Sequence, residues 1–302
     1  MAIDTRVTEG RIPFKGGNTW YRSVEAEREE GKQPLLCLHG GPGANWLHLK
    51  PYELLADERR VVFYDQLGSG NSALTEPHDP SMWTPELFVE EVDIVRDALG
   101  LDRVHILGHS WGGMLGMHYA SGRPDGLVSL IVESSPASVP AWLPEVERLR
   151  AELPPEVEAT LRKHEETGTT DDPEYEEAVM VFYRRHLCRV DPWPDWVVQC
   201  FEALEANPEV YHSMNGPSEF HVIGTIKDWD ITDRLGQIEV PTLVFGGRYD
   251  EVTPAITEAA ARGIQGSEYV VMEESSHMAQ AEEPEKTLAL VRDFLARAEA
   301  RT

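Results

Sequence analysis

The sequence contains few cysteines, three in 302 residues, and they fit no disulfide framework. The chain has an odd number of cysteines, and Cys37, Cys188 and Cys200 are widely spaced, which argues against a secreted domain held by disulfides. Their spacing also matches no metal-binding motif. No run of about 18 apolar residues occurs, and "MAIDTRVTEGRIPF" lacks the apolar segment of a secretion signal. We therefore expect a cytoplasmic protein that needs neither a metal nor a cofactor.

Positive charge is also scarce. The chain has 27 Lys and Arg residues against 53 Asp and Glu residues, a formal net charge of −26. Such a chain would repel nucleic-acid phosphates and anionic lipids, so we expect neither nucleic acid nor a membrane as a partner. An acidic excess is typical of a well-solvated protein surface. The alternative interpretation is that the negative charge creates an electrostatic field that attracts cationic substrates.

Short apolar runs alternate with segments of helical period, and this alternation predicts an α/β fold. A mostly parallel sheet covered by helices on both faces is expected, with an edge hairpin around Gly16-Gly17-Asn18. The helix over residues 84–100 has Thr84 as its expected N-cap and Pro85 at the first helical position. The predicted core strands cover residues 34–40, 59–65, 103–108, 127–134, 241–247 and 267–274.

The alternation of predicted strands and helices stops in the middle of the chain. Residues 136–236 are rich in Pro, Trp and Glu, show helical patches and offer no strong strand. We interpret them as an α-helical cap inserted between two parts of one core, residues 1–135 and 237–302. A separately folding domain is the alternative interpretation.

The segment "VHILGHSWGGM" holds a serine in the pattern G-x-S-x-G, after an apolar run and before a helical segment. In a nucleophile elbow, glycines such as Gly108 and Gly112 allow a strained turn that lifts the serine hydroxyl above the sheet edge. The alternative is that Ser110 lies in an ordinary turn and has no catalytic role. The strand before it and the helix after it favour Ser110 as a nucleophile.

A serine nucleophile needs a base and an acid to orient that base, in the chain order Ser, Asp or Glu, His. Asp250 follows the predicted strand 241–247, and His277 follows the strand 267–274, so both lie at carboxyl ends of parallel strands. The sequence therefore predicts Ser110, Asp250 and His277 as the catalytic residues. The other histidines considered, each expected to be structural, are His39, His105, His109 and His118.

The pattern "HGGPG", residues 39–43, follows the first parallel strand and predicts an oxyanion loop. Backbone N–H donors are expected from Gly41 and from Trp111, the residue after the nucleophile, with Gly40 as the alternative if the register differs by one. These groups together predict acyl transfer to water through an acyl-enzyme on Ser110. Epoxide or haloalkane chemistry would need a carboxylate at the elbow.

Five motifs of this chain resemble the prolyl aminopeptidase (proline iminopeptidase) family of α/β-hydrolases. They are "HGGPG", "YDQLGSGNS", "GHSWGG", "GRYDEVTP" and "SSHMA". The stretch "MNGPSEFHVIGTIKDWDIT" is similar to the branch with the tricorn-interacting aminopeptidase and bacterial amino acid amidases. This resemblance implies an α/β-hydrolase fold with a helical cap, acting on short peptides or amino acid amides with a free N-terminal residue.

In that family two carboxylates hold the substrate ammonium, and the resemblance places them at Glu219 and Glu251. A bound ammonium between two carboxylates would pair with both, and a substrate without the amine would leave two charges opposed. The chain departs from many family members at His109 and at Leu67. The change at Leu67 resembles the tricorn-factor branch, so it argues against a strict proline preference and leaves other small or apolar N-terminal residues open.

Two other functions remain open at the level of sequence. An esterase or lactonase would use the same serine, histidine and aspartate without recognising an amine. A non-catalytic receptor of the same fold would show a broken set of these residues or a broken oxyanion loop, and neither is visible in the sequence. The sequence does not indicate the oligomeric state.

Overall fold

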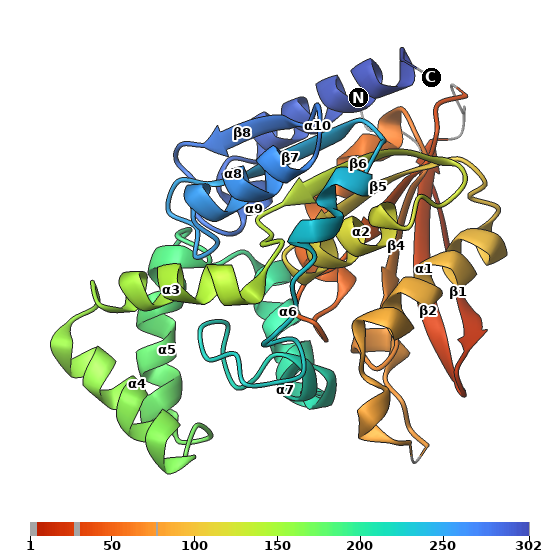
Figure 1. Ribbon diagram of the computed structural model, residues 1–302. Helices are drawn as coiled ribbons and strands as arrows, with labels where there is room; N and C mark the ends of the chain where they lie inside the picture. The colour runs from red at the N-terminus through yellow and green to blue at the C-terminus, as the bar shows by residue number, and fades with distance from the viewer. Residues whose placement is uncertain (1–4, 27–30, 77, 302) are drawn as a thin grey trace.

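The computed structural model describes residues 5–26, 31–76 and 78–301, and within them the chain forms an eight-stranded sheet (Figure 1). The strand order is β1-β2-β4-β3-β5-β6-β7-β8, antiparallel at β1, β2 and β4 and parallel from β4 onward. This architecture confirms the predicted α/β class. The strands are β1 (Thr5–Phe14), β2 (Gly17–Ala26), β3 (Leu35–Leu38), β4 (Val61–Asp65), β5 (Val104–His109), β6 (Leu127–Glu133), β7 (Thr242–Gly247) and β8 (Glu268–Met272).

The edge hairpin exists, but its turn lies earlier than predicted. Lys15 and Gly16 have positive φ values of 44° and 83°, and Gly17 already pairs with Phe14. A tight hairpin turn needs positive φ at both central residues, which places the turn at Lys15-Gly16. Gly17 and Asn18 therefore belong to β2.

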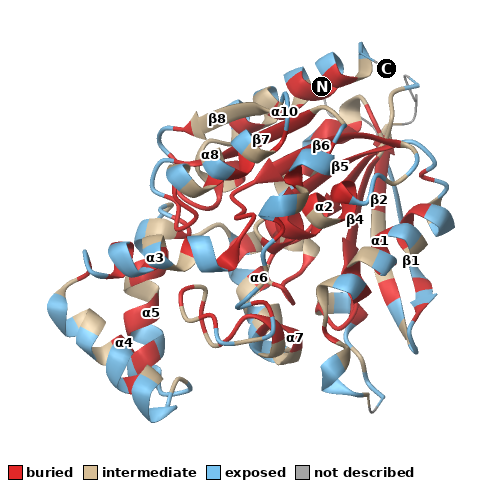
Figure 2. Ribbon diagram, in the orientation of Figure 1, coloured by how far each residue is buried: buried red, intermediate tan, exposed pale blue. Residues whose placement is uncertain are grey.

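The central strands are buried on both faces, and their side chains alternate between two apolar clusters (Figure 2). In β3, Leu36 and Leu38 enter one cluster, while Leu35 and Cys37 enter the other. This period of two follows from the pleat of a strand, and Cys37 is buried by it.

Helices cover both faces of the sheet (Figure 1). The last turn of α1 is closed by Gly100 at φ 64°, and the helix begins as predicted, with Thr84 Oγ1 accepting from Leu87 N at 3.3 Å. Outside the segment between β6 and β7, the α-helices that contribute to the first cluster are α1 (Pro85–Leu99), α2 (Trp111–Ser121) and α8 (Pro254–Gly263). The helices of the second cluster are the 3₁₀ helix η1 (Trp46–Asp57), α9 (Ala279–Glu282) and α10 (Pro284–Glu299).

Between β6 and β7 the chain runs through five further α-helices and the 3₁₀ helix η4 (Thr232–Gln237), and Figure 1 shows these α-helices gathered at one end of the sheet. Ser138 and Asp230 join the two ends of this segment by a β-bridge and by a Ser138 Oγ–Asp230 Oδ2 hydrogen bond of 2.8 Å. We call residues 136–236 the cap; that boundary stays a prediction. The cap helices are α3 (Val139–Arg150), α4 (Pro155–Thr167), α5 (Pro173–His186), α6 (Asp195–Ala206) and α7 (Glu209–Met214).

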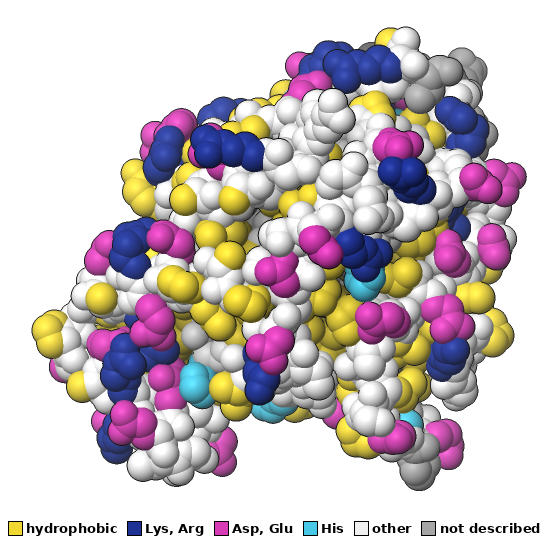
Figure 3. All heavy atoms as spheres, viewed as in Figure 1, with side chains coloured by type: hydrophobic (Ala, Val, Ile, Leu, Met, Phe, Trp, Pro, Cys, Tyr) yellow, Lys and Arg dark blue, Asp and Glu magenta, His cyan; other side chains and the backbone are white. Residues whose placement is uncertain are grey.

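Positive and negative side chains are mixed on the face seen in Figure 3, where Lys and Arg side chains lie among Asp and Glu side chains. Among the described residues, no helix combines the length and the apolar character that a membrane span requires.

A buried arginine organises the cap. Arg150 at the end of α3 has a side chain only 1% exposed, and it pairs with Glu158 at 3.1 Å and with Glu165 at 3.0 Å, both from α4. Its guanidinium also lies 4.9 Å from the centre of the Phe220 ring. Because the buried guanidinium pairs with two half-buried carboxylates of the next helix, Arg150 fixes α3 against α4.

We predict that Arg150→Met lowers the free energy of unfolding by about 2 kcal/mol, because it removes a buried guanidinium that pairs with the half-buried carboxylates of Glu158 and Glu165. The matched control is Arg148→Met on the same helix, where the exposed Arg148 pairs with Glu152 at 2.8 Å and a loss of about 0.5 kcal/mol is expected. Urea unfolding of both variants measures the difference. Equal losses in the two variants would contradict this account of the cap.

Candidate active site

Ser110 sits in a strained turn between β5 and α2. Its φ of 56° and ψ of −125° lie outside the regions that non-glycine residues usually adopt. Ser110 N donates to Glu133 O at 2.9 Å, and Ser110 O accepts from Ser135 Oγ at 2.8 Å. Neighbouring backbone and side chain therefore hold the elbow that the sequence predicted, with the serine side chain at the carboxyl end of β5.

The glycines of the motif are required by close backbone approach. A Cβ on Gly108 would lie 2.1 Å from Gly112 O, and a Cβ on Gly112 would lie 2.0 Å from Leu38 O. No side chain fits at either position, so the pattern G-x-S-x-G lets α2 start directly against β3 and β5.

Asp250 and His277 come together at the ends of β7 and β8. The His277 Nδ1–Asp250 Oδ1 distance is 2.8 Å, and both side chains are buried. Asp250 Oδ1 also accepts from Val252 N at 2.8 Å, which orients the carboxylate. A ring nitrogen bound to a carboxylate in this way fixes the imidazole and leaves Nε2 to face the pocket.

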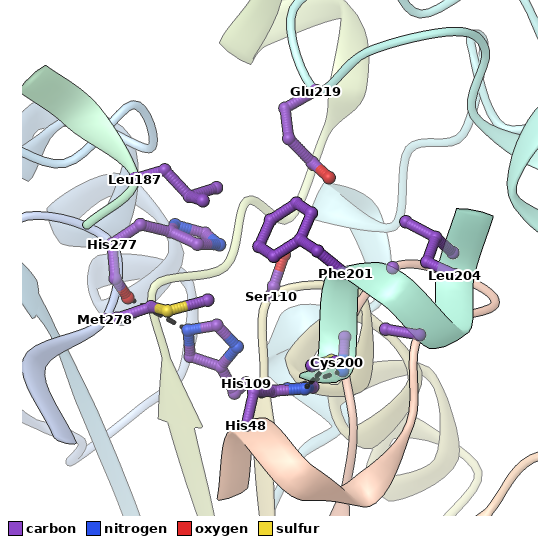
Figure 4. Close-up of a pocket in the computed structure, with 13 residues that line it drawn as sticks. His48, His109, Ser110, Leu187, Cys200, Phe201, Leu204, Glu219, His277 and Met278 are labelled. Carbon is purple, nitrogen blue, oxygen red and sulfur yellow. Dashed lines mark hydrogen bonds between the residues drawn. The ribbon is translucent and has the colours of Figure 1, made fainter. Parts of the chain in front are cut away.

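His277 and Ser110 line the same cavity (Figure 4). The fold therefore brings Ser110, His277 and Asp250 together from three distant segments of the sequence, as expected for a nucleophile, a base and an acid. The cavity is lined by Gly40, Gly41, Ala44, His48, His109, Ser110, Leu187, Cys200, Phe201, Leu204, Glu219, His277 and Met278.

Several lining residues were not predicted from sequence. Leu187, Phe201 and Leu204 come from the cap and give the cavity an apolar wall. Leu187 directly follows α5, and Phe201 and Leu204 lie in α6, where the sequence shows only helical periodicity. Several large aromatics of the cap are not among the lining residues: Trp142, Trp193, Trp196, Phe220 and Trp229. Trp142 instead donates from Nε1 to Glu251 O at 2.9 Å and ties the cap to the core.

The loop "HGGPG" lies next to Ser110. Gly41 has a φ of 110°, and a Cβ there would lie 2.6 Å from Ala44 N, so this position requires glycine. Gly40 N–H donates to His48 Nε2 at 3.0 Å. Because the Gly40 donor is thus occupied, the geometry favours Gly41 over Gly40 as the loop's oxyanion donor, together with Trp111 N–H at the start of α2.

The motif "DQLGSGN" connects the oxyanion loop to the elbow. Gln66 donates from Nε2 to His39 O at 2.9 Å, and its Oε1 accepts from Trp111 Nε1 at 2.8 Å. Asp65 accepts from Trp46 N and from Asn71 N, at 2.9 and 2.8 Å, and so closes the turn that presents Gln66.

The two glutamates named by the resemblance both lie near His277. Glu251 is 1% exposed, and among the described residues neither of its carboxylate oxygens has a hydrogen-bond partner. Its Oε1 lies 3.9 Å from His277 Nε2. Glu219, partly buried, reaches the cavity from the cap, where its Oε1 accepts from Tyr211 OH at 2.7 Å and its N–H donates to Tyr183 OH at 3.2 Å.

The end of α5 joins the two loops that carry the candidate acid and base. His186 O accepts from Glu251 N at 3.3 Å and from His277 N at 3.2 Å. Leu187 O accepts from Met278 N at 3.1 Å. The cap therefore contacts the backbone of both loops, so its packing and the geometry of the site are coupled.

The charges of these groups are interdependent. Burial alone would lower the pKa of His277, but Asp250, Glu251 and Glu219 outweigh it and raise this pKa to about 10. Burial raises the pKa of Glu251 well above its usual value, and Glu219 and Asp250 add to the effect. Burial likewise raises the pKa of Glu219, against the hydrogen bond from Tyr211.

The other histidines have structural partners. His109 Nε2 donates to His277 O at 2.9 Å, and Gln66 N donates to His39 Nε2 at 2.9 Å. His105 contacts Ser129 Oγ at 2.6 Å, and His118 Nε2 lies 3.0 Å from Arg234 Nη1. His109 also lines the cavity, with its ring 4.7 Å from the ring of His277.

One cluster among the described residues has metal-binding spacing: His164, Asp172 and Glu174, in the cap. Glu174 Oε2 already pairs with Lys163 Nζ at 2.6 Å and with His164 Nε2 at 3.1 Å. These contacts neutralise the carboxylate without an ion, and they give no reason to place a metal there.

Comparison with known proteins assigns the chain to a family. The family model for the alpha/beta hydrolase fold matches residues 33–284. A proline iminopeptidase of Heyndrickxia coagulans is 40% identical over 288 residues, which cover 95% of this chain and 98% of that relative.

Two solved structures are similar over almost the full length. The crystal structure of proline iminopeptidase from Mycobacterium smegmatis is 42% identical with a TM-score of 0.90, covering 97% of this chain and 99% of that one. The crystal structure of VinJ is 44% identical with a TM-score of 0.93, covering 96% of this chain and 99% of that one. The predicted resemblance is confirmed: the chain belongs to the proline iminopeptidase family of α/β-hydrolase-fold enzymes.

Proposed function

We propose that this protein is a serine aminopeptidase that hydrolyses the amide bond after a free N-terminal residue of short peptides or amino acid amides. Family membership supports the reaction class. The observation that carries the proposal is the buried Glu251 carboxylate, whose oxygens have no hydrogen-bond partner among the described residues. Its Oε1 lies 3.9 Å from Nε2 of His277, and His277 lines the same cavity as Glu219. An ammonium group is the ligand that would satisfy both carboxylates.

In the first half of the reaction, Ser110 Oγ attacks the carbonyl carbon of the N-terminal residue while His277 Nε2 accepts the hydroxyl proton. The negative charge on the carbonyl oxygen is stabilised by the N–H groups of Gly41 and Trp111. His277 then gives its proton to the leaving amine as the C–N bond breaks. An ester between Ser110 and the N-terminal residue remains.

In the second half, water attacks this ester with His277 again accepting a proton. The imidazolium returns that proton to Ser110 Oγ as the C–O bond breaks, and the free amino acid leaves. Asp250 holds the imidazole by the 2.8 Å contact at Nδ1 and stabilises its cationic form in both halves.

The substrate ammonium has a second effect on the base. In the resting site, an imidazolium at His277 is the cation closest to Glu251, at 3.9 Å. When a substrate ammonium pairs with Glu251 and Glu219, it takes over that neutralising role and lowers the tendency of His277 to hold a proton. Amine binding thereby favours the neutral imidazole that the first step requires.

The apolar wall of Leu187, Phe201, Leu204 and Met278 suits a small or apolar substrate side chain. The names of the relatives support proline as one N-terminal residue. An esterase or lactonase would use the same serine and histidine, but it would leave the two glutamates without a ligand.

We predict that N-acetylation of an amino acid p-nitroanilide lowers kcat/KM by about 10²-fold or more, because the blocked amine leaves the carboxylates unpaired. Glu219→Gln should cause a loss of the same order with the free substrate, while Ser110 still reacts with a fluorophosphonate probe. Equal rates for free and acetylated substrates would exclude the aminopeptidase and favour the esterase.

Glu202→Gln serves as the matched control for Glu219→Gln. Glu202 lies exposed on the cap helix α6, and the substitution removes the same charge from the same segment. We expect kcat/KM within about 2-fold of wild type, since an exposed charge contributes little to a buried site.

We predict that the rate of Ser110 labelling by a fluorophosphonate rises with pH through a midpoint above 6.5, the ordinary pKa of histidine, because the three carboxylates hold the imidazolium. Glu251→Gln removes one of these charges, so the pKa of His277 falls and the midpoint moves to lower pH. Labelling across a pH series in both proteins measures the shift. An unchanged or higher midpoint in the variant would show that Glu251 does not act on His277.

A further inference from the structure

His48 has no role in the chemistry described above, yet it lies at the junction of three parts of the site. It belongs to η1, its side chain is 3% exposed, and it lines the cavity (Figure 4). Its ring contacts the oxyanion loop on one side and the cap helix α6 on the other. A buried imidazole between these elements can fix their relative positions.

The hydrogen bond from Gly40 N–H determines which nitrogen of His48 carries the proton. Because an amide N–H only donates, His48 Nε2, at 3.0 Å, must be the unprotonated acceptor. The ring proton is then on Nδ1, which lies 3.7 Å from Cys200 Sγ of α6. Burial, with His39 and His277 nearby, lowers the pKa of His48 to about 3, so the ring is neutral as this bond requires.

Other contacts hold His48 in place. Gln280 Nε2 donates to His48 O at 3.0 Å, and the rings of His48 and His109 lie 5.0 Å apart. The acceptor that faces Gly40 is therefore fixed by core contacts on one side and by the cap on the other.

The position of Gly40 makes this hydrogen bond matter for the chemistry. A Cβ on Gly40 would lie 3.1 Å from Ser110 Cβ, so the Gly40 backbone packs directly against the elbow. The loop contains two neighbouring backbone N–H groups, those of Gly40 and Gly41. A rotation of the backbone between these residues would turn the Gly40 N–H toward the substrate in place of the Gly41 N–H. Binding the Gly40 N–H prevents that exchange.

We propose that His48 is a positioning residue that accepts the Gly40 N–H and thereby holds the oxyanion loop so that Gly41 N–H is presented to the substrate carbonyl oxygen. Cys200 ties this imidazole to α6, so the seating of the cap supports the same loop. The inference rests on the acyl-transfer chemistry proposed above.

The test compares three variants with wild type. His48→Phe keeps a planar ring without an acceptor, His48→Gln offers an amide oxygen near the place of Nε2, and His48→Asn offers an amide that is too short to reach Gly40. For each we measure kcat and KM with an aminoacyl p-nitroanilide, the rate of Ser110 phosphonylation, and the melting temperature. Phosphonylation also develops charge on an oxygen in the oxyanion hole, so it reports on the loop independently of amine recognition.

We expect His48→Phe and His48→Asn to lower kcat by about 10²-fold with KM within about 3-fold of wild type, because a misplaced donor affects the transition state more than substrate binding. Phosphonylation should slow in parallel, and His48→Gln should recover both rates to within about 10-fold of wild type. If His48→Phe does not fold, the comparison of His48→Asn with His48→Gln carries the test.

The inference is wrong if His48→Phe or His48→Asn, folded as judged by melting, keeps kcat and the phosphonylation rate within about 3-fold of wild type. It is also wrong if His48→Gln is impaired as strongly as His48→Asn. Failure of the wild-type protein to cleave any aminoacyl substrate would instead contradict the proposed function, and the phosphonylation rates would still decide the role of His48.

Discussion

The site depends on one buried imidazole surrounded by carboxylates. His277 is bound by Asp250 at 2.8 Å on one nitrogen and lies 3.9 Å from Glu251 on the other, with Glu219 near the same cavity. Negative charges this close together in a dehydrated space require a cation. In the proposed mechanism the imidazolium fills that role in the resting enzyme and a substrate ammonium fills it during turnover, which links substrate recognition to the protonation state of His277.

The cap is part of this arrangement rather than an added cover. Backbone carbonyls at the end of α5 bind the N–H groups of Glu251, His277 and Met278, so the loops after β7 and β8 are positioned from both the sheet and the cap. Tyr211 and Tyr183 of the cap hold Glu219. Moving the cap would therefore disturb the imidazole and the two carboxylates proposed to bind the substrate amine together.

Much of this could be predicted from sequence because local rules determine it. The strand period, the Thr84 cap and the glycines at 108 and 112 each follow from a short-range constraint of backbone geometry, and the structure agrees with them. The predicted hairpin turn lay too late in the chain because Lys15 adopts a positive φ, a backbone conformation that a sequence usually signals by glycine. Long-range contacts between cap and core have no such local signal. The cavity wall from Phe201 and Leu204, and the acceptor role of His48, arise from packing that periodicity does not specify.

The central claim is that one cavity places a substrate ammonium between Glu219 and Glu251 while its carbonyl carbon faces residue 110. A crystal structure of Ser110→Ala with a bound dipeptide tests this most directly. The account predicts the N-terminal nitrogen within about 3.2 Å of an oxygen of each carboxylate, with the carbonyl oxygen toward Gly41 and Trp111. A peptide bound with its N-terminus directed away from both glutamates would contradict it.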